Sequence, residues 1–125
     1  MFAITLSSGP FLVAPNAQSV DWVLINDSAA PQPFRVSVYK WGVGVAKVLL
    51  GPGAITDTLP AGMAFHNANS VPSLFVPGFY YEVVVETNSP HVLPNVNQWS
   101  SHGGTDFIPG TLIPAAAFVK RAEHP

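Results

Sequence analysis

Residues 79–87 read FYYEVVVET, and this stretch decides the fold class. Aromatic and β-branched side chains occupy every odd position, whereas Glu82 and Glu86 fall on the opposite face, which is the period of a half-buried β-strand. Residues 34–41, FRVSVYKW, repeat the pattern, with residues 34, 36 and 38 directed inward. The chain therefore contains at least two amphipathic strands.

Turn residues divide the rest of the chain in the same way. Thirteen prolines and ten glycines cut 125 residues into short apolar runs, and strands are predicted at 2–6, 11–14, 20–26, 45–50, 54–59, 63–67 and 111–120. Residues 67–77 and 88–109 are predicted to be loops. Turns at intervals of about 8–12 residues are typical of an all-β protein, an immunoglobulin-like antiparallel β-sandwich of seven to eight strands. We expect a single domain over residues 1–125, with a frayed tail at 120–125.

Four segments resemble a known class of domains: residues 22–26 (WVLIN), 34–39, 58–62 (TLPAG) and 80–86. Together they resemble fibronectin-III-like and bacterial cell-adhesion-related immunoglobulin-like domains. The resemblance implies binding, adhesion or scaffolding as the activity. The chain departs from true immunoglobulin domains because it has no cysteine pair.

Composition argues against several function classes. Only 10% of residues are charged and the net charge is -2, so five Lys and Arg residues are too few to follow a nucleic-acid backbone. The absence of cysteine excludes disulfides and thiolate chemistry. The N-terminus lacks the basic start of a signal peptide, and no apolar run approaches the ~18 residues of a membrane span. We therefore expect no nucleic acid, no membrane insertion and, by default, a cytoplasmic location.

The outward face of the two clean strands is unusually apolar. If these strands are neighbours, one sheet surface carries aromatic side chains edged by charges, and Tyr, Trp and Arg dominate interface hot spots. Two alternatives stay open: association with a protein partner, most simply as a homodimer, or cover by the segment 88–109. Trp22 is assigned to the core instead. The predicted interaction residues are Arg35, Tyr39, Trp41, Tyr80, Glu82, Val84, Glu86 and Trp99.

No motif predicts catalysis, a cofactor or a metal site. Ser100, Ser101, His102 and Asp106 contain the letters of a nucleophilic triad, but no nucleophile elbow accompanies them. Glu82 and Glu86 lie about 13 Å apart along a strand, too far for a glycosidase pair, and we expect cross-strand charge pairing with Arg35 or Lys40.

The predicted function is thus a non-catalytic protein-interaction, adhesion or structural module. One alternative is a carbohydrate-binding module, in which Tyr39, Trp41 or Trp99 stacks on sugar rings. The other is a small hydrolase or metal enzyme that uses His91, His102 and Asp106 in the segment 88–109.

Overall fold

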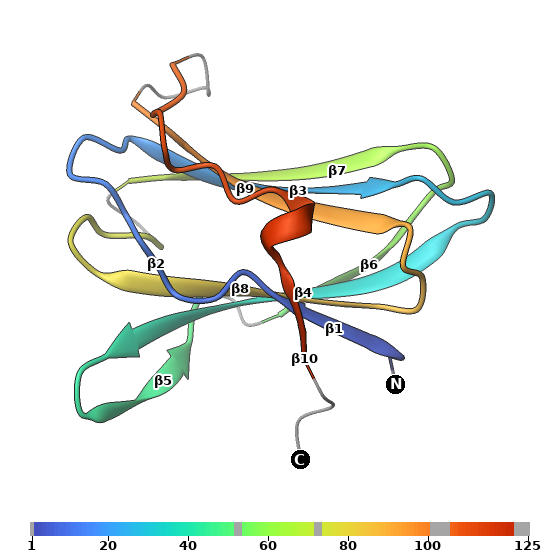
Figure 1. Ribbon diagram of the computed structural model, residues 1–125, viewed down its shortest axis with the longest axis horizontal. Helices are drawn as coiled ribbons and strands as arrows, with labels where there is room; N and C mark the ends of the chain where they lie inside the picture. Colours follow the sequence, from blue (N-terminus) through green and yellow to red (C-terminus); the bar gives the residue numbers. More distant parts are fainter. Residues whose placement is uncertain (1, 52–53, 72–73, 101–105, 122–125) are drawn as a thin grey trace.

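Two antiparallel sheets pack face to face in the computed structural model, which describes residues 2–51, 54–71, 74–100 and 106–121 (Figure 1). The larger sheet has the strand order β10 (Val119–Arg121), β1 (Ile4–Ser7), β8 (Tyr80–Thr87), β4 (Gln32–Gly42), β5 (Val45–Leu49). In addition, β2 (Phe11–Leu12) pairs with β8, and β6 (Ile55–Leu59) pairs with β4. The smaller sheet has the order β7 (Ala64–Ser70), β3 (Ser19–Asn26), β9 (Val92–Trp99). The all-β sandwich predicted from the sequence is confirmed.

The core lies between the inner faces of the two sheets. Residues 34, 36 and 38 of β4 and residues 81, 83 and 85 of β8 are all buried there, as the alternation predicted. Trp22 of β3 is buried opposite them and stacks on Phe65, with ring centroids 5.5 Å apart. Phe75 packs edge-on against Tyr81 at 4.9 Å. Each such side chain contributes about 1.5–3 kcal/mol by leaving water, so these aromatics account for much of the attraction between the sheets.

Asn26 ties the end of β3 to two connections. Its side chain is fully buried, and its amide nitrogen donates to the carbonyl oxygens of Ala30 and Leu59, both at 2.9 Å. Its side-chain oxygen accepts hydrogen bonds from the backbone and hydroxyl of Ser28. A buried amide with every partner in place holds the turn after β3 beside the end of β6.

The predicted loop at 88–109 is wrong over residues 92–99. Residues 92–99 form β9, which pairs with β3 along its whole length. Pro94 argued against a strand, but β9 is an edge strand, where a missing N–H is tolerated. The chain therefore crosses from the larger to the smaller sheet between β8 and β9.

The C-terminal prediction also needs correction. Within the predicted strand at 111–120, only residues 119–120 are in a strand, because residues 115–117 form the 3-10 turn η1. Arg121, expected in the frayed tail with Lys120, instead belongs to β10 and pairs with Thr5 of β1. The remainder of that tail, 122–125, lies outside the described residues. Strand segments in the described ranges number ten: nine overlap the predicted strands, and β9 is the addition.

Candidate functional site

The outer face of the larger sheet brings together seven of the eight predicted interaction residues. Strands β4 and β8 are neighbours, and their register places Arg35 beside Glu86, Tyr39 beside Glu82, and Trp41 beside Tyr80. Arg35 and Glu86 form a two-point ion pair, with nitrogen–oxygen distances of 2.9 and 2.7 Å. This is the cross-strand pair expected for Arg35.

Glu82 lies at the centre of this face but is not part of its surface, contrary to the prediction. The side chain is completely buried, since partners from four other strands surround the carboxylate. The Lys47 ammonium lies 3.2 Å from Oε1, the Arg121 guanidinium 2.6 Å from Oε2, and the Trp41 indole nitrogen 3.1 Å from Oε1. The Ser7 hydroxyl also donates to Oε2. A charge with two cations and two further donors can be buried at tolerable cost.

The same partners determine the ionisation of Glu82. Burial by itself raises the pKa of this carboxyl, but the hydrogen bonds from Ser7 and Lys47 and the positive charges of Lys47 and Arg121 outweigh burial. The pKa of Glu82 therefore lies below its ordinary value, and the carboxylate is ionised at neutral pH.

Lys47 also partly covers the aromatic side chains of this face. Its ammonium lies 4.4 Å from the ring centroid of Tyr39 and 5.2 Å from that of Trp41, within the range of cation–π attraction. Both rings are half-buried, and Val84 is buried, so the predicted aromatic surface is smaller than expected. Tyr80 remains exposed. The Lys47 side chain from β5 thus covers part of a face for which the sequence left two alternatives open, a protein partner or cover by residues 88–109.

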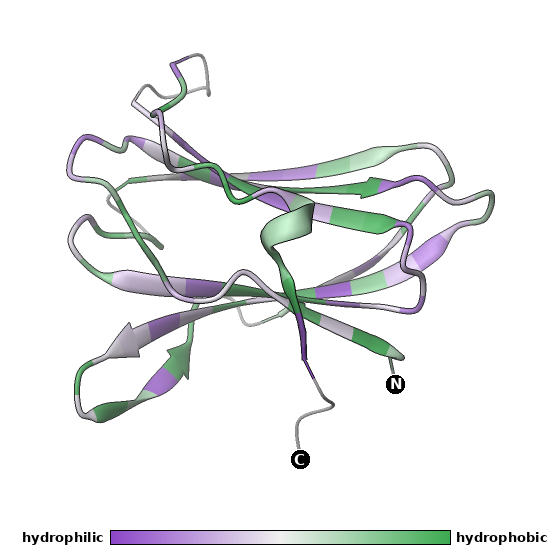
Figure 2. Cartoon of the chain, in the orientation of Figure 1, coloured by the Kyte–Doolittle hydropathy of each residue, from purple (hydrophilic) through white to green (hydrophobic). Residues whose placement is uncertain are grey.

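Exposed apolar side chains gather instead on the hairpin of β4 and β5, which the sequence analysis did not single out. Val43 at the turn is fully exposed, and Val45, Val48 and Leu49 are 66%, 58% and 46% exposed. Figure 2 shows the hydrophobic colouring along this hairpin, which extends beyond the body of the sandwich (Figures 1 and 2). The signal was the run VGVAKVLL at 43–50, which contains a single charge.

The hairpin owes its shape to two glycines. Gly44 has a φ of +72°, a backbone conformation that favours glycine in a tight turn. The register between β4 and β5 shifts between Lys40 and Gly42, which marks a β-bulge at this point. A Cβ on Gly42 would come within 2.5 Å of the Val45 side chain. Glycine thus lets β5 lie close to β4 while its apolar side chains stay in solvent.

Trp99 is separate from the other seven residues. It lies on β9, in the smaller sheet, and its indole nitrogen donates to Asp21 at 3.1 Å. The other oxygen of Asp21 lies 2.7 Å from the His66 ring nitrogen Nε2, and Phe107 packs edge-on against Trp99. A row of sugar-stacking rings that joins Trp99 to Tyr39 and Trp41 is therefore not formed.

Of the residues named for hydrolase or metal chemistry, His91, Ser100 and Asp106 lie within the described residues. Ser101 and His102 fall outside the described residues. In the described ranges, no three His, Asp or Glu side chains come together in a way that could hold a metal ion. Those ranges also contain no helix of the length and hydropathy needed to cross a membrane.

Comparison with solved structures identifies the fold. A Thermotoga maritima protein, described as Thermotoga maritima 1070, superposes on this chain with a TM-score of 0.56 and 9% identity, over 96% of this chain and 91% of that one. A sensory rhodopsin transducer from Anabaena gives a TM-score of 0.46 and 15% identity, over 78% of this chain and 82% of its own length. No protein-family model matches the sequence, and no curated protein matches it. At 9% identity the likeness to the Thermotoga maritima protein concerns architecture alone: the chain shares that protein's fold.

Proposed function

We propose that this chain is a non-catalytic interaction module that self-associates through the β4–β5 hairpin and the adjoining outer face of the larger sheet. The observation that carries the proposal is the exposure of Val43, Val45, Val48 and Leu49 on one projecting hairpin. Val45 and Leu49 lie on the outer face of β5, with Val43 at the turn, whereas Val48 lies on the opposite face of the strand. Full burial of a side chain of this size contributes about 1.5–3 kcal/mol, so the three on the outer side in each copy favour a stable contact.

A second copy of the chain is the partner that the charges favour. The only charged residue of the hairpin between 43 and 49 is Lys47, and its ammonium already faces the Glu82 carboxylate. With a net charge of -2 over 125 residues, two copies repel each other weakly. A homodimer also needs a single self-complementary patch, which one hairpin and the nearby Tyr80 can supply.

The proposed contact is between side chains rather than between strand edges. Lys47 stands at the middle of β5, and a lysine in an edge strand discourages further strand pairing. The two-sheet architecture then serves as a rigid support, and the binding or adhesion role implied by the resemblance to immunoglobulin-like and fibronectin-III-like domains is part of this proposal.

Two valines of similar exposure provide a matched test. Val45 of β5 is 66% exposed, and Val119 of β10, at the opposite edge of the larger sheet, is 63% exposed. Sedimentation velocity from about 1 μM to about 100 μM should show a concentration-dependent dimer for the natural chain. Val45→Lys should weaken dimerisation by about tenfold or more, whereas Val119→Lys should leave it unchanged. A monomeric natural chain across this range, or equal behaviour of the two variants, contradicts the proposal.

A further inference from the structure

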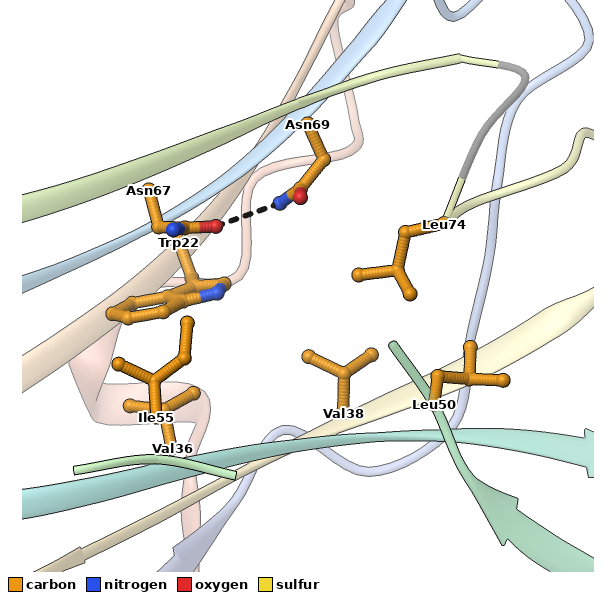
Figure 3. Close-up of a pocket in the computed structure, with 8 residues that line it drawn as sticks. All are labelled: Trp22, Val36, Val38, Leu50, Ile55, Asn67, Asn69 and Leu74. Carbon is orange, nitrogen blue, oxygen red and sulfur yellow. Dashed lines mark hydrogen bonds between the residues drawn. The ribbon is translucent and has the colours of Figure 1, made fainter. Parts of the chain in front are cut away.

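A cavity of about 100 Å³ lies between the two sheets, and its lining includes Leu50, the residue directly after β5 (Figure 3). Eight side chains line the cavity: five are aliphatic, one is an indole, and two are asparagines from β7 of the smaller sheet. The asparagines hydrogen-bond to each other at 3.0 Å. The lining residues are Trp22, Val36, Val38, Leu50, Ile55, Asn67, Asn69 and Leu74.

The indole N–H of Trp22 borders this cavity and donates no hydrogen bond to any residue that the structure describes. Trp22 is only 2% exposed, and its Nε1 has no hydrogen-bond partner among the described residues. Yet no completely buried side-chain nitrogen or oxygen in the described ranges lacks a partner, so this N–H must border accessible space. Figure 3 shows the nitrogen turned toward the part of the cavity where Val38, Asn69 and Leu74 lie.

The other two tryptophans differ in this respect. The indole nitrogen of Trp41 donates to Glu82, and that of Trp99 donates to Asp21. Buried tryptophans usually find an acceptor because an unpaired N–H is costly. The free donor of Trp22 therefore distinguishes the cavity from an ordinary packing gap.

The size and lining of the cavity restrict what can occupy it. An apolar cavity of about 150 Å³ in another protein holds benzene, so about 100 Å³ is enough for roughly one small ring. None of the lining residues is charged, which disfavours ions. The Trp22 N–H and the two asparagine amides supply the about 2–4 polar partners that a water molecule needs, so water is the competing occupant that the experiment must distinguish.

We propose that this cavity is a binding site for a small uncharged molecule, about the size of a single ring, that carries one hydrogen-bond acceptor. The acceptor receives the Trp22 N–H, and the ring contacts the aliphatic walls. The two asparagines flank the ligand on the side of the smaller sheet. The site differs from the proposed self-association surface, because none of the exposed hairpin residues Val43, Val45, Val48 and Leu49 lines the cavity.

Cyclopentanone and cyclopentane are suitable probes, because they differ only in the carbonyl acceptor. In ¹H–¹⁵N spectra of the full chain, cyclopentanone should shift the indole resonance of Trp22 and leave those of Trp41 and Trp99 in place. Trp22→Phe removes the donor and keeps an aromatic ring. It should weaken cyclopentanone binding by about fivefold more than it weakens cyclopentane binding, the ratio expected for one net hydrogen bond.

A cavity-filling variant separates this site from non-specific binding. Ile55→Phe should abolish binding of both probes, whereas Leu12→Phe, at an exposed position outside the cavity, should not affect it. If Ile55→Phe does not fold, Leu50→Phe fills the same space. The proposal is overturned if neither probe shifts the Trp22 resonance, if the N–H contacts water only, or if the filled variant binds like the natural chain.

Discussion

Replacing Glu82 by glutamine tests whether a buried charge network closes the outer face of the larger sheet. Glutamine keeps the shape of the side chain but removes the charge that Ser7, Trp41, Lys47 and Arg121 surround. Hydrogen bonds to a charged group contribute about 1 kcal/mol more than those between neutral groups, so weakening the two from Ser7 and Trp41 costs about 2 kcal/mol. The two cations are partly exposed and regain water, so their loss adds little.

The pH dependence of the free energy of unfolding tests this prediction most directly. The folded pKa of Glu82 lies below the unfolded one, so as the pH falls the unfolded chain binds the proton first. The stability contributed by Glu82 is therefore fully present above the ordinary glutamate pKa and is lost as the pH falls through the folded value. Urea unfolding should show a gap of about 2 kcal/mol between the natural chain and Glu82→Gln at about pH 7, and the gap should shrink toward about pH 3.

Glu86→Gln is the matched control on the same strand. Glu86 pairs with Arg35 at the surface, and exposed pairs contribute about 0–1 kcal/mol. The reasoning is refuted if the two glutamine variants lose the same stability, or if the gap for Glu82→Gln is the same at both pH values.

Three further predictions concern other parts of the fold. Asn26→Ala leaves the carbonyls of Ala30 and Leu59 without their donor. The free energy of unfolding, measured in urea, should fall by about 2–4 kcal/mol, whereas a fall below about 1 kcal/mol would show that the buried amide is dispensable. Burial raises the pKa of Tyr81, so as the pH rises the unfolded chain loses this proton first, and stability should fall above about pH 10. Tyr81→Phe should lose less stability at alkaline pH than the natural chain does. An equal loss in the two chains contradicts the argument. Gly44→Val places a β-branched residue at a φ of +72° and should lower stability by about 1–2 kcal/mol, measured by thermal unfolding, whereas a neutral result means that the turn rearranges.

Alternation along two strands was enough to predict the central part of the candidate site. The period of two in 34–41 and 79–87 assigned each side chain to the correct face, and neighbouring placement followed from the sandwich architecture. The charge pair of Arg35 with Glu86 could be anticipated for the same reason, because opposite residues on adjacent strands lie close together.

Strand β9 was missed because the effect of a proline on strand formation depends on whether the strand is central or at an edge of the sheet. Val92, Pro94, Val96 and Gln98 all keep the inward period, but a proline within the run makes the segment resemble a loop. Proline excludes a central strand and permits an edge strand, and the sequence does not state which strand will be at an edge. Trp99 was assigned to the wrong surface for the same reason.

The order of apolar and polar residues by itself determined that this chain forms a two-sheet β-sandwich, because only paired amphipathic strands can bury such a pattern. Which outward residues remain exposed was decided by the tertiary structure alone. Lys47 and Arg121 reach Glu82 from strands far from it in the sequence, and they bury a carboxylate that periodicity places at the surface. The exposure of a side chain on the outer face of a sheet depends on which other side chains cover it. Residues as distant in the chain as Lys47 and Arg121 come to lie beside Glu82 only after the sheets have assembled.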